Sequence, residues 1–419
     1  MIAVLRQRNF ALLWFGGLIS MAGDWVLRIG LPLYIYQVTG STLATGIMFM
    51  AAMLPSLLLG SVAGVFVDRW DRKQTMVIAN VLLAGSLLPL LLVRSAEWVW
   101  IAYIAAFAQS CIAQFFDPAE SAMLPLLVGE EHLPTANALN ALNNNLARLI
   151  GPAIGGVVLA VGGLTGVALV DAASFLIAAG MIALITANGR AVRAETPAAA
   201  EGAGGRWLAV WREWVEGLRI VVQTRTVAII FLLLGITSLG EGVISVLFAP
   251  FVSKVLGGGG TEFGAIASAQ AVGGLIGGAL IGEVARRVRP GRLIGVCGIL
   301  FGLIDLAIFN YPVFGAAVIL MVLVGLPGVG FSTGVTTLLQ TSTANQYLGR
   351  VFGALGTTAS LLALIGAGLA SVLGDRIGIV PVLNLQGAGY ILAGALALVL
   401  LAHVALPRAQ APAEESVPA

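Results

Sequence analysis

Ionisable residues stand inside long apolar stretches of this chain, and the stretch "SMAGDWVLRIG" at residues 20–30 is the clearest example. Asp24 and Arg28 are four residues apart there, which places them on one helical face where they partly neutralise each other. Glu241 is similarly deep in a second apolar stretch, and Arg148 lies in a third. A charge at the centre of a membrane helix costs roughly 2.5–3.5 kcal/mol, so such a residue faces protein or a wet cavity.

Two kinds of role suit these residues. A carboxylate whose basic partner approaches and leaves can release and bind a proton, because a nearby positive charge favours the ionised form. Asp24 and Glu241 are the candidate acids, with Arg28 and Arg148 as the candidate bases. The alternative is an internal salt bridge between Asp24 and Arg28 that only orients helices. The sequence leaves both open.

The amino-acid composition indicates an integral membrane protein. Of the 419 residues, 59% are hydrophobic and 10% are charged, and the mean hydropathy is +0.99. A soluble domain carries roughly 25% charged residues. The two cysteines, Cys111 and Cys297, lie far apart and offer neither a disulfide framework nor a metal-ligand spacing. The net charge of +2 gives no indication of nucleic-acid binding, and we expect no metal and no cofactor.

Apolar runs long enough to cross a membrane, about 20 residues each, recur along the whole chain. They cover residues 10–36, 43–66, 74–93, 98–116, 136–162, 166–187, 226–252, 262–284, 292–309, 312–338, 351–373 and 378–406. A polar connection over 188–225 separates six runs from six. This predicts an all-α membrane protein of twelve transmembrane helices in two pseudo-symmetric six-helix bundles, 1–187 and 226–407, followed by a disordered tail at 408–419.

The basic residues predict the orientation of the chain in the membrane. If the N-terminus is cytoplasmic and the runs alternate, seventeen of the 22 lysines and arginines fall on the cytoplasmic side. Only Arg94, Lys254 and Arg376 fall on the outer side. We therefore expect both termini, and the tail, to be cytoplasmic.

The linker between the two sets of runs contains an amphipathic stretch at about 206–222. Trp207, Trp211, Trp214, Leu218 and Val221 recur at spacings of four, three, four and three, which forms one apolar stripe on a helix. Tryptophans at a membrane border favour a helix that lies flat on the cytoplasmic face. A helix packed against loops is the alternative.

The two sets of runs show a weak internal repeat. A Gly-Asp pair in the first run aligns with a Gly-Glu pair in the seventh, which superposes Asp24 on Glu241, and the loops after runs two and eight are both basic. Two related halves with a site between them near the bilayer midplane are typical of secondary transporters. Asp171 and Asp305 lie nearer the ends of their runs, and we give them less weight.

The cytoplasmic end of run two carries a charged motif, G-x3-D-R-x2-R-K, formed by Gly64, Asp68, Arg69, Arg72 and Lys73. It resembles the signature loop between helices two and three of the major facilitator superfamily, although Asp71 stands where that family usually has a glycine. The resemblance implies a cytoplasmic gate, in which Asp68 and the basic residues contact helix ends of the other half. An acid favours a helix N-terminus and a base favours a C-terminus, so such contacts are physically reasonable.

Run five contains the segment "RLIGPAIGG", with Gly151, Pro152, Gly155 and Gly156. Glycines four apart let another helix approach closely, and a proline loosens the backbone. The segment resembles the end of the superfamily's antiporter motif, which implies export, although alanines replace the upstream glycines of that motif. Packing of small residues without a transport role is the alternative.

Three further segments narrow the resemblance: "FFDPAESAMLPLLVGEEHLPTANAL", "EWVEGLRIVVQTR" and "LLQTSTANQYLGRVFG". They are similar to the twelve-helix drug-efflux branch that contains macrolide and siderophore exporters. The arginine that many proton-coupled members carry on helix four is absent, and run four offers glutamines instead. The family's cavity helices, mapped onto this chain, give these candidate substrate contacts: Trp25, Met48, Phe49, Met53, Gln109, Gln114, Ser245 and Gln270.

The resemblance implies a multidrug exporter of the bacterial cytoplasmic (inner) membrane. It would exchange hydrophobic or amphipathic small molecules for protons by alternating access, and so give antibiotic resistance. Its partners would be the small-molecule substrate, protons and membrane lipids, with no nucleic acid, and we expect a monomer. A lipid or siderophore exporter, or a passive facilitator of the same fold without proton coupling, is the alternative. An enzyme is disfavoured, because the only histidines, His132 and His403, lie far apart and no catalytic motif is evident.

Overall fold

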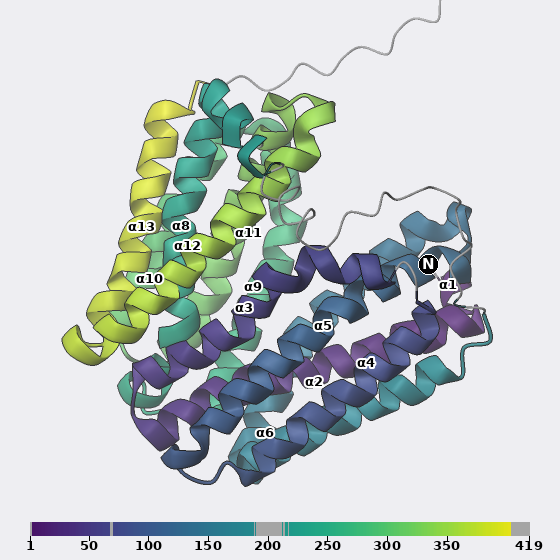
Figure 1. Ribbon diagram of the computed structural model, residues 1–419. Coiled ribbons are helices and arrows are strands. Elements are labelled where there is room, and N and C mark those ends of the chain that lie inside the picture. The colour runs from purple at the N-terminus through teal and green to yellow at the C-terminus, as the bar shows by residue number, and fades with distance from the viewer. Residues whose placement is uncertain are drawn as a thin grey trace, which may run out of the picture.

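The computed structural model describes residues 2–67, 70–187, 189, 212, 214–216 and 218–403, and these residues are helical almost throughout (Figure 1). The helices are α1 (Ile2–Leu5), α2 (Arg8–Thr39), α3 (Thr42–Val67), α4 (Arg72–Leu87), α5 (Val99–Val128), α6 (Leu133–Ala183), α8 (Arg225–Pro250), α9 (Gly260–Arg287), α10 (Pro290–Asn310), α11 (Phe314–Ser342), α12 (Leu348–Ile377) and α13 (Ile379–Leu400). Single turns of 3-10 or π helix join several of them. The predicted all-α fold is confirmed.

Among the described residues, eleven helices are long and apolar enough to cross a membrane. The sequence predicts twelve spans, and the difference lies in α6, which covers both the fifth and the sixth apolar run. Gly163 interrupts α6 with φ 58° and ψ −159°, a conformation that suits only glycine. A Cβ on Gly166 would lie 3.4 Å from the carbonyl oxygen of Val158, so the arms 133–162 and 164–183 fold back on each other. Counted separately, these arms give the twelve predicted passes.

Several helix ends follow from single residues. α2 ends at Gly40, whose φ of 66° lets its N–H donate to the Tyr36 carbonyl at 2.7 Å. α4 begins after Asp71, whose carboxylate accepts from a backbone N–H three residues later at 2.9 Å. The fourth run was expected to end near residue 116, but α5 continues to Val128 past two internal prolines. Membrane helices tolerate prolines because neighbouring groups satisfy the freed backbone.

Figure 1 shows α2–α6 gathered in one bundle and α8–α13 in another. Small residues let helices within a bundle approach closely. Gly242 on α8 lies against the carbonyl of Ala363 on α12, and Gly366 on α12 lies against the carbonyl of Leu239 on α8. A larger side chain at either glycine would force these two helices apart.

The outer surface carries large apolar side chains. Ile78, Ile319 and Val399 are 57%, 64% and 72% exposed, and many other Leu, Ile, Val and Phe residues are also exposed. In water an apolar surface of this extent would associate, whereas in a bilayer it contacts acyl chains. The chain is therefore a multi-pass membrane protein.

The two bundles are close together at one end of the molecule and apart at the other. The Gly40 end is defined by the Gly40 turn, the start of α9 and the end of α12, and the linker end by the starts of α2, α4 and α12. At the Gly40 end the bundles touch, since α6 contacts α9 and α3 contacts α12. Toward the linker end the two bundles diverge (Figure 1).

Of the described linker residues, 212, 214–216 and 218–223 are helical. Val221 is 5% exposed and packs in a hydrophobic cluster with residues of the C-terminal bundle. Glu216 lies 3.4 Å from the guanidinium of Arg350, at the start of α12. This helix therefore packs against the C-terminal bundle, while Trp207 and Trp211, like the tail 408–419, lie outside the described residues.

Candidate functional site

The first candidate centre lies in the N-terminal bundle, around Asp24 in the middle of α2. The preceding residue, Gly23, packs against α6, where a Cβ on Gly23 would lie 2.6 Å from Oδ1 of Asp171. Asp171 is fully buried, and its Oδ2 has no hydrogen-bond partner among the described residues. Ser174 donates to the Asp171 backbone carbonyl at 2.7 Å and to its Oδ1 at 3.3 Å. Asp171, which received less weight from sequence, thus adjoins the first candidate acid.

Arg28 lies one turn beyond Asp24 on α2, and its side chain is exposed. Its guanidinium carbon is 5.5 Å from the centre of the Trp25 ring, a cation–π arrangement. In the described part of the chain no ion pair within 4.0 Å joins Arg28 to Asp24, although the two charges interact at longer range. The pair therefore neutralises itself only in part.

Two acids of α5 belong to the same region, and sequence reasoning missed them. The charge of Asp117 acts on Asp24, and that of Arg28 acts on Asp117. Glu120 is half-buried and accepts from Asn140 Nδ2 of α6 at 3.5 Å. The predicted run four ends at residue 116, so both acids lie beyond its end. Reading the apolar "AMLPLLV" after them as helix would have placed them inside a membrane span.

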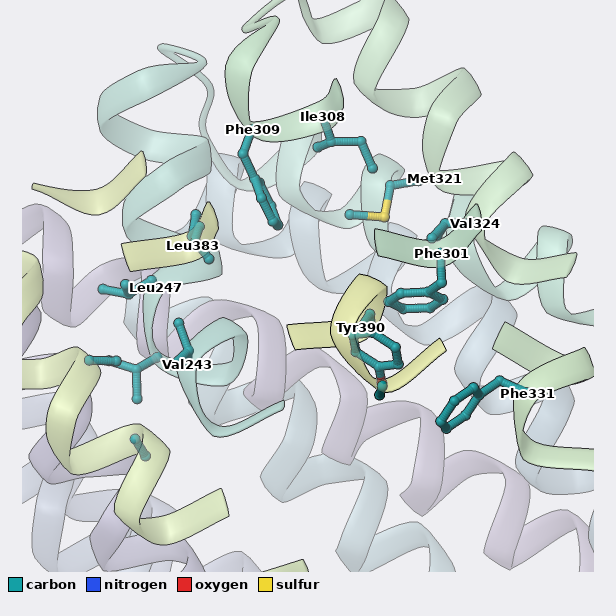
Figure 2. Packing of buried hydrophobic residues seen from close by; sticks show 14 of the residues in the cluster. Val243, Leu247, Phe301, Ile308, Phe309, Met321, Val324, Phe331, Leu383 and Tyr390 are labelled. Atoms are coloured by element: carbon teal, nitrogen blue, oxygen red, sulfur yellow. The ribbon is translucent and has the colours of Figure 1, made fainter. Parts of the chain in front are cut away.

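The second candidate centre lies in the C-terminal bundle, around Glu241 of α8. The Tyr390 hydroxyl of α13 donates to Glu241 Oε1 at 2.6 Å. The Tyr390 ring is 7% exposed and lies 4.2 Å from the Phe301 ring and 5.7 Å from the Phe331 ring, centre to centre (Figure 2). Packing of the ring thus fixes the hydroxyl, and the hydroxyl fixes one carboxylate oxygen.

Charges from two other helices surround Glu241. Asp305 of α10 is 1% exposed, has no hydrogen-bond partner for its Oδ2 within the described residues, and interacts with Glu241 electrostatically. Arg148 of α6 comes from the other bundle, and among the described residues no ion pair within 4.0 Å joins it to Glu241, so the two charges interact only at longer range. Glu241 and Arg148 are both exposed residues.

The glycines of run five use two faces of α6. Gly151 packs against Trp25, and a Cβ on Gly155 would lie 2.8 Å from Val26 Cα, so these two residues hold α6 against α2 in the same bundle. Pro152 and Gly156 face the other bundle. The Pro152 carbonyl meets Gly264, and Gly156 meets Gly260, both on α9. The motif therefore lies where the two bundles approach each other at the Gly40 end.

The signature loop is described in part. Gly64 belongs to α3, whereas Asp68 and Arg69 lie outside the described residues. Arg72 donates to the Ala122 carbonyl of α5 at 3.0 Å, and Lys73 donates to the Ile185 carbonyl after α6 at 2.6 Å. Both acceptors belong to the N-terminal bundle, and Lys73 places a positive charge where the dipole of α6 favours one.

The candidate substrate contacts differ in their surroundings. Gln109 donates to the Leu83 carbonyl at 3.0 Å, and Gln114 and Ser245 donate to carbonyls of their own helices at 3.2 and 2.7 Å. Met48 is 5% exposed and packs in the core of the N-terminal bundle. The remaining candidates are half-buried: Trp25, Phe49, Met53 and Gln270. Within the described residues no three His, Cys, Asp or Glu side chains gather as metal ligands would.

The family described as transmembrane secretion effector, MFS_3, matches residues 1–418. The chain belongs to this family of the major facilitator superfamily. The predicted resemblance is confirmed, and this family member is a transporter that exports small molecules, not an enzyme.

Individual relatives agree with the family assignment. The chain is 27% identical to macrolide efflux protein A of Streptococcus pyogenes over 378 residues, 88% of this chain and 90% of the relative. It is 26% identical to the enterobactin exporter EntS of Citrobacter koseri over 425 residues, 98% of this chain and 95% of the relative. A crystal structure of a bacterial homologue of the iron transporter ferroportin, in an inward-facing state, superposes with a TM-score of 0.72 at 17% identity, over 94% of this chain and 98% of that chain. This last likeness concerns the fold alone.

Proposed function

We propose that this exporter moves hydrophobic or amphipathic drugs, macrolides among them, out of the bacterial cytoplasm in exchange for protons. Its likeness to macrolide efflux protein A supports the substrate class. Two bundles that touch at one end and diverge at the other support alternating access, in which the bundles rock about a central site. Ionisable groups in both bundles support proton exchange.

The orientation of the chain follows from its arginines. We place the linker end in the cytoplasm, because seventeen of the 22 basic residues then lie on the cytoplasmic side. Both termini are then cytoplasmic in an inner-membrane protein. With this orientation the divergent end opens to the cytoplasm and the Gly40 end is closed, so the conformation is inward-facing.

The proton part of the proposal depends on one observation, the origin of the charges around Glu241. Arg148 lies in the other bundle, so rocking changes its distance from Glu241. When Arg148 is near, the ionised carboxylate is favoured, and when it withdraws, the protonated form is favoured. Arg28, in contrast, lies on the same helix as Asp24 and moves with it. Glu241 with Arg148 is therefore our first choice for proton exchange, and Asp24 with Arg28 is the second.

The remaining assignments are also proposals. Gly64, Asp68, Arg69, Arg72 and Lys73 form the cytoplasmic gate, which the resemblance to the superfamily implies. Gly151, Pro152, Gly155 and Gly156 set the close approach of α6 to α2 and α9 that an antiporter needs, which the glycine contacts support. Of the substrate contacts, Trp25, Phe49, Met53 and Gln270 are supported by partial exposure, and Met48 is the least supported, because it is buried.

A siderophore exporter is the second candidate function. The likeness to the enterobactin exporter EntS extends over 98% of this chain, more than the 88% for macrolide efflux protein A. A siderophore, like a macrolide, is a small molecule that a central site between the two bundles accommodates. Substrate competition separates the two candidates.

Retention of a labelled macrolide tests the proposal. An efflux-deficient bacterium that produces the chain is loaded with radiolabelled erythromycin, and the retained label is measured with and without a protonophore. We expect the chain to lower retention and the protonophore to restore it. The control is a Gly264→Trp variant compared at equal expression level. Its larger side chain would clash with the Pro152 carbonyl on α6, so we expect it not to transport. Retention equal to that of this variant contradicts macrolide export, and export that ignores the protonophore contradicts proton exchange. Export of enterobactin alone would favour the second candidate.

A further inference from the structure

An acid at the Gly40 end joins the two bundles. Asp375, near the end of α12, reaches the first turn of α3. Its Oδ1 accepts from the Thr42 N–H at 2.8 Å and from Thr42 Oγ1 at 2.9 Å. Its Oδ2 accepts from the Ser41 hydroxyl at 2.8 Å and from the Leu43 N–H at 3.3 Å. All four bonds cross from the C-terminal to the N-terminal bundle.

The position of Asp375 matches what α3 requires. The first N–H groups of a helix have no acceptor within the helix, and the helix dipole favours a negative charge at that end. Hydrogen bonds to a carboxylate are also shorter and stronger than bonds between neutral groups. A helix usually receives its cap from an adjacent residue of the chain. Here Ser41 Oγ supplies part of the cap by accepting from the Leu43 N–H at 3.1 Å. Asp375, 333 residues away from Thr42, supplies the charge.

Packing around the carboxylate is tight. Thr42 is 1% exposed and its hydroxyl also approaches the Ser371 carbonyl at 2.9 Å. Gly46 of α3 lies against Ser371, and a Cβ on Gly374 would lie 2.7 Å from Thr42 Oγ1. α3 and α12 therefore meet without room for a larger side chain, and separation of the bundles at this end must break the bonds of Asp375.

We propose that Asp375 is a gating residue that holds the Gly40 end closed by capping α3 from the opposite bundle. Separation of the bundles at this end breaks these bonds and exposes the α3 N–H groups and the carboxylate to water. The cap thus biases the equilibrium toward the conformation with a closed Gly40 end. Its part in transport rests on the proposed alternating access, whereas the bias itself is a property of the two bundles and is measurable without a substrate.

Distances between spin labels test the gating role. Cys111→Ala and Cys297→Ala remove both cysteines. Labels at Gln37→Cys and Ile377→Cys report the Gly40 end, and labels at Glu130→Cys and Ala344→Cys, in a second protein, report the linker end. Pulsed electron paramagnetic resonance on full-length protein in nanodiscs gives both distance distributions.

We expect Asp375→Ala to raise the ratio of open to closed Gly40 ends about five- to tenfold, which is the loss typical of a helix cap. Distances at the linker end shorten in step if the bundles rock. Asp375→Asn shifts the ratio less, because an amide oxygen still accepts but carries no charge. The double variant Ser41→Ala/Thr42→Val keeps the acid and removes two donors, so it shifts the ratio in the same direction and serves if Asp375→Ala does not fold.

Glu97→Ala is the matched control. It removes one negative charge from the same end of the molecule, at an exposed position in a 3-10 turn, and we expect wild-type distances. Distances in Asp375→Ala and in the double variant that equal those of this control would overturn the gating role. A shift in distances without any macrolide export would leave the gating role standing and count against the proposed function.

Discussion

The first helix of each bundle, α2 and α8, carries a glycine followed by an acid, and the two acids have different surroundings. Gly23 packs against Asp171 and Ser174 on the last helix of its bundle, and Gly240 packs against Gln386 on the last helix of the other bundle. The weak repeat in the sequence thus corresponds to the same close crossing of the first and last helices in both bundles. Close packing is common to both bundles, whereas the chemistry differs.

The difference lies in what holds each acid. Asp24 interacts with Arg28, Asp117 and Asp171, all in its own bundle, and these charges move with it when the bundles rock. Glu241 is held by Tyr390 in its own bundle but interacts with Arg148 in the other. A charge whose partner lies across the moving interface senses the conformation directly. The C-terminal centre is therefore the better candidate for coupling protons to movement.

Charge removal at each acid gives the largest expected effect. In proteoliposomes with a pH gradient, we expect Glu241→Gln to lower gradient-driven macrolide transport at least tenfold, since no proton then exchanges at this carboxylate. Asp24→Asn should lower it several-fold while the response to the gradient remains. Glu283→Gln, the same change at an exposed ion pair with Arg287, is the control. The reverse order of the two effects would assign coupling to the N-terminal centre.

Alanine at each glycine tests the shared helix crossing. A Cβ on Gly23 would lie 2.6 Å from the buried Asp171 carboxylate, whereas a Cβ on Gly240 would lie 2.8 Å from the Gln386 side chain. Overpacking costs about 1–3 kcal/mol, and the longer glutamine yields more easily. Thermal unfolding in detergent should show a larger loss for Gly23→Ala than for Gly240→Ala. Gly180→Ala on α6, where a Cβ meets open space, should not lower stability. Equal unfolding temperatures for all three would contradict the close packing.

Loss of the tyrosine hydroxyl tests what holds Glu241. Tyr390→Phe keeps the ring contacts and removes the 2.6 Å bond, so we expect a loss of about 0.5–1.5 kcal/mol of stability, typical of one hydrogen bond. The loss should vanish in a Glu241→Ala background, which has no side-chain acceptor, only if that bond is its cause, and the double-mutant cycle measures the coupling by thermal unfolding. Additive losses would show that the hydroxyl acts elsewhere.

The succession of apolar runs along the sequence predicted the fold. It did not predict which side chains surround each candidate acid. Apolar runs gave every membrane pass, because a helix must match the bilayer thickness wherever it lies in the fold. Asp171 was undervalued because depth along a run does not show which helix it faces, and only folding brings it beside Gly23. Asp117 was missed because a proline follows it, a signal that ends soluble helices more often than membrane helices. Arg148 was found as a charge, but its position across the interface from Glu241 depends on how the bundles dock.

The smallest expected effect concerns the linker helix, whose described residues pack with the C-terminal bundle. Glu216 and Arg350 lie 3.4 Å apart, but their side chains are 54% and 49% exposed, so solvent screens the pair. Glu216→Ala should therefore change stability by at most about 0.5 kcal/mol. Val221→Ala, at the buried side of the same helix, should cost more, because it leaves unfilled space beside the C-terminal core. Thermal unfolding compares the two, and a larger loss for Glu216→Ala would mean that charge, not apolar contact, attaches the linker to its bundle.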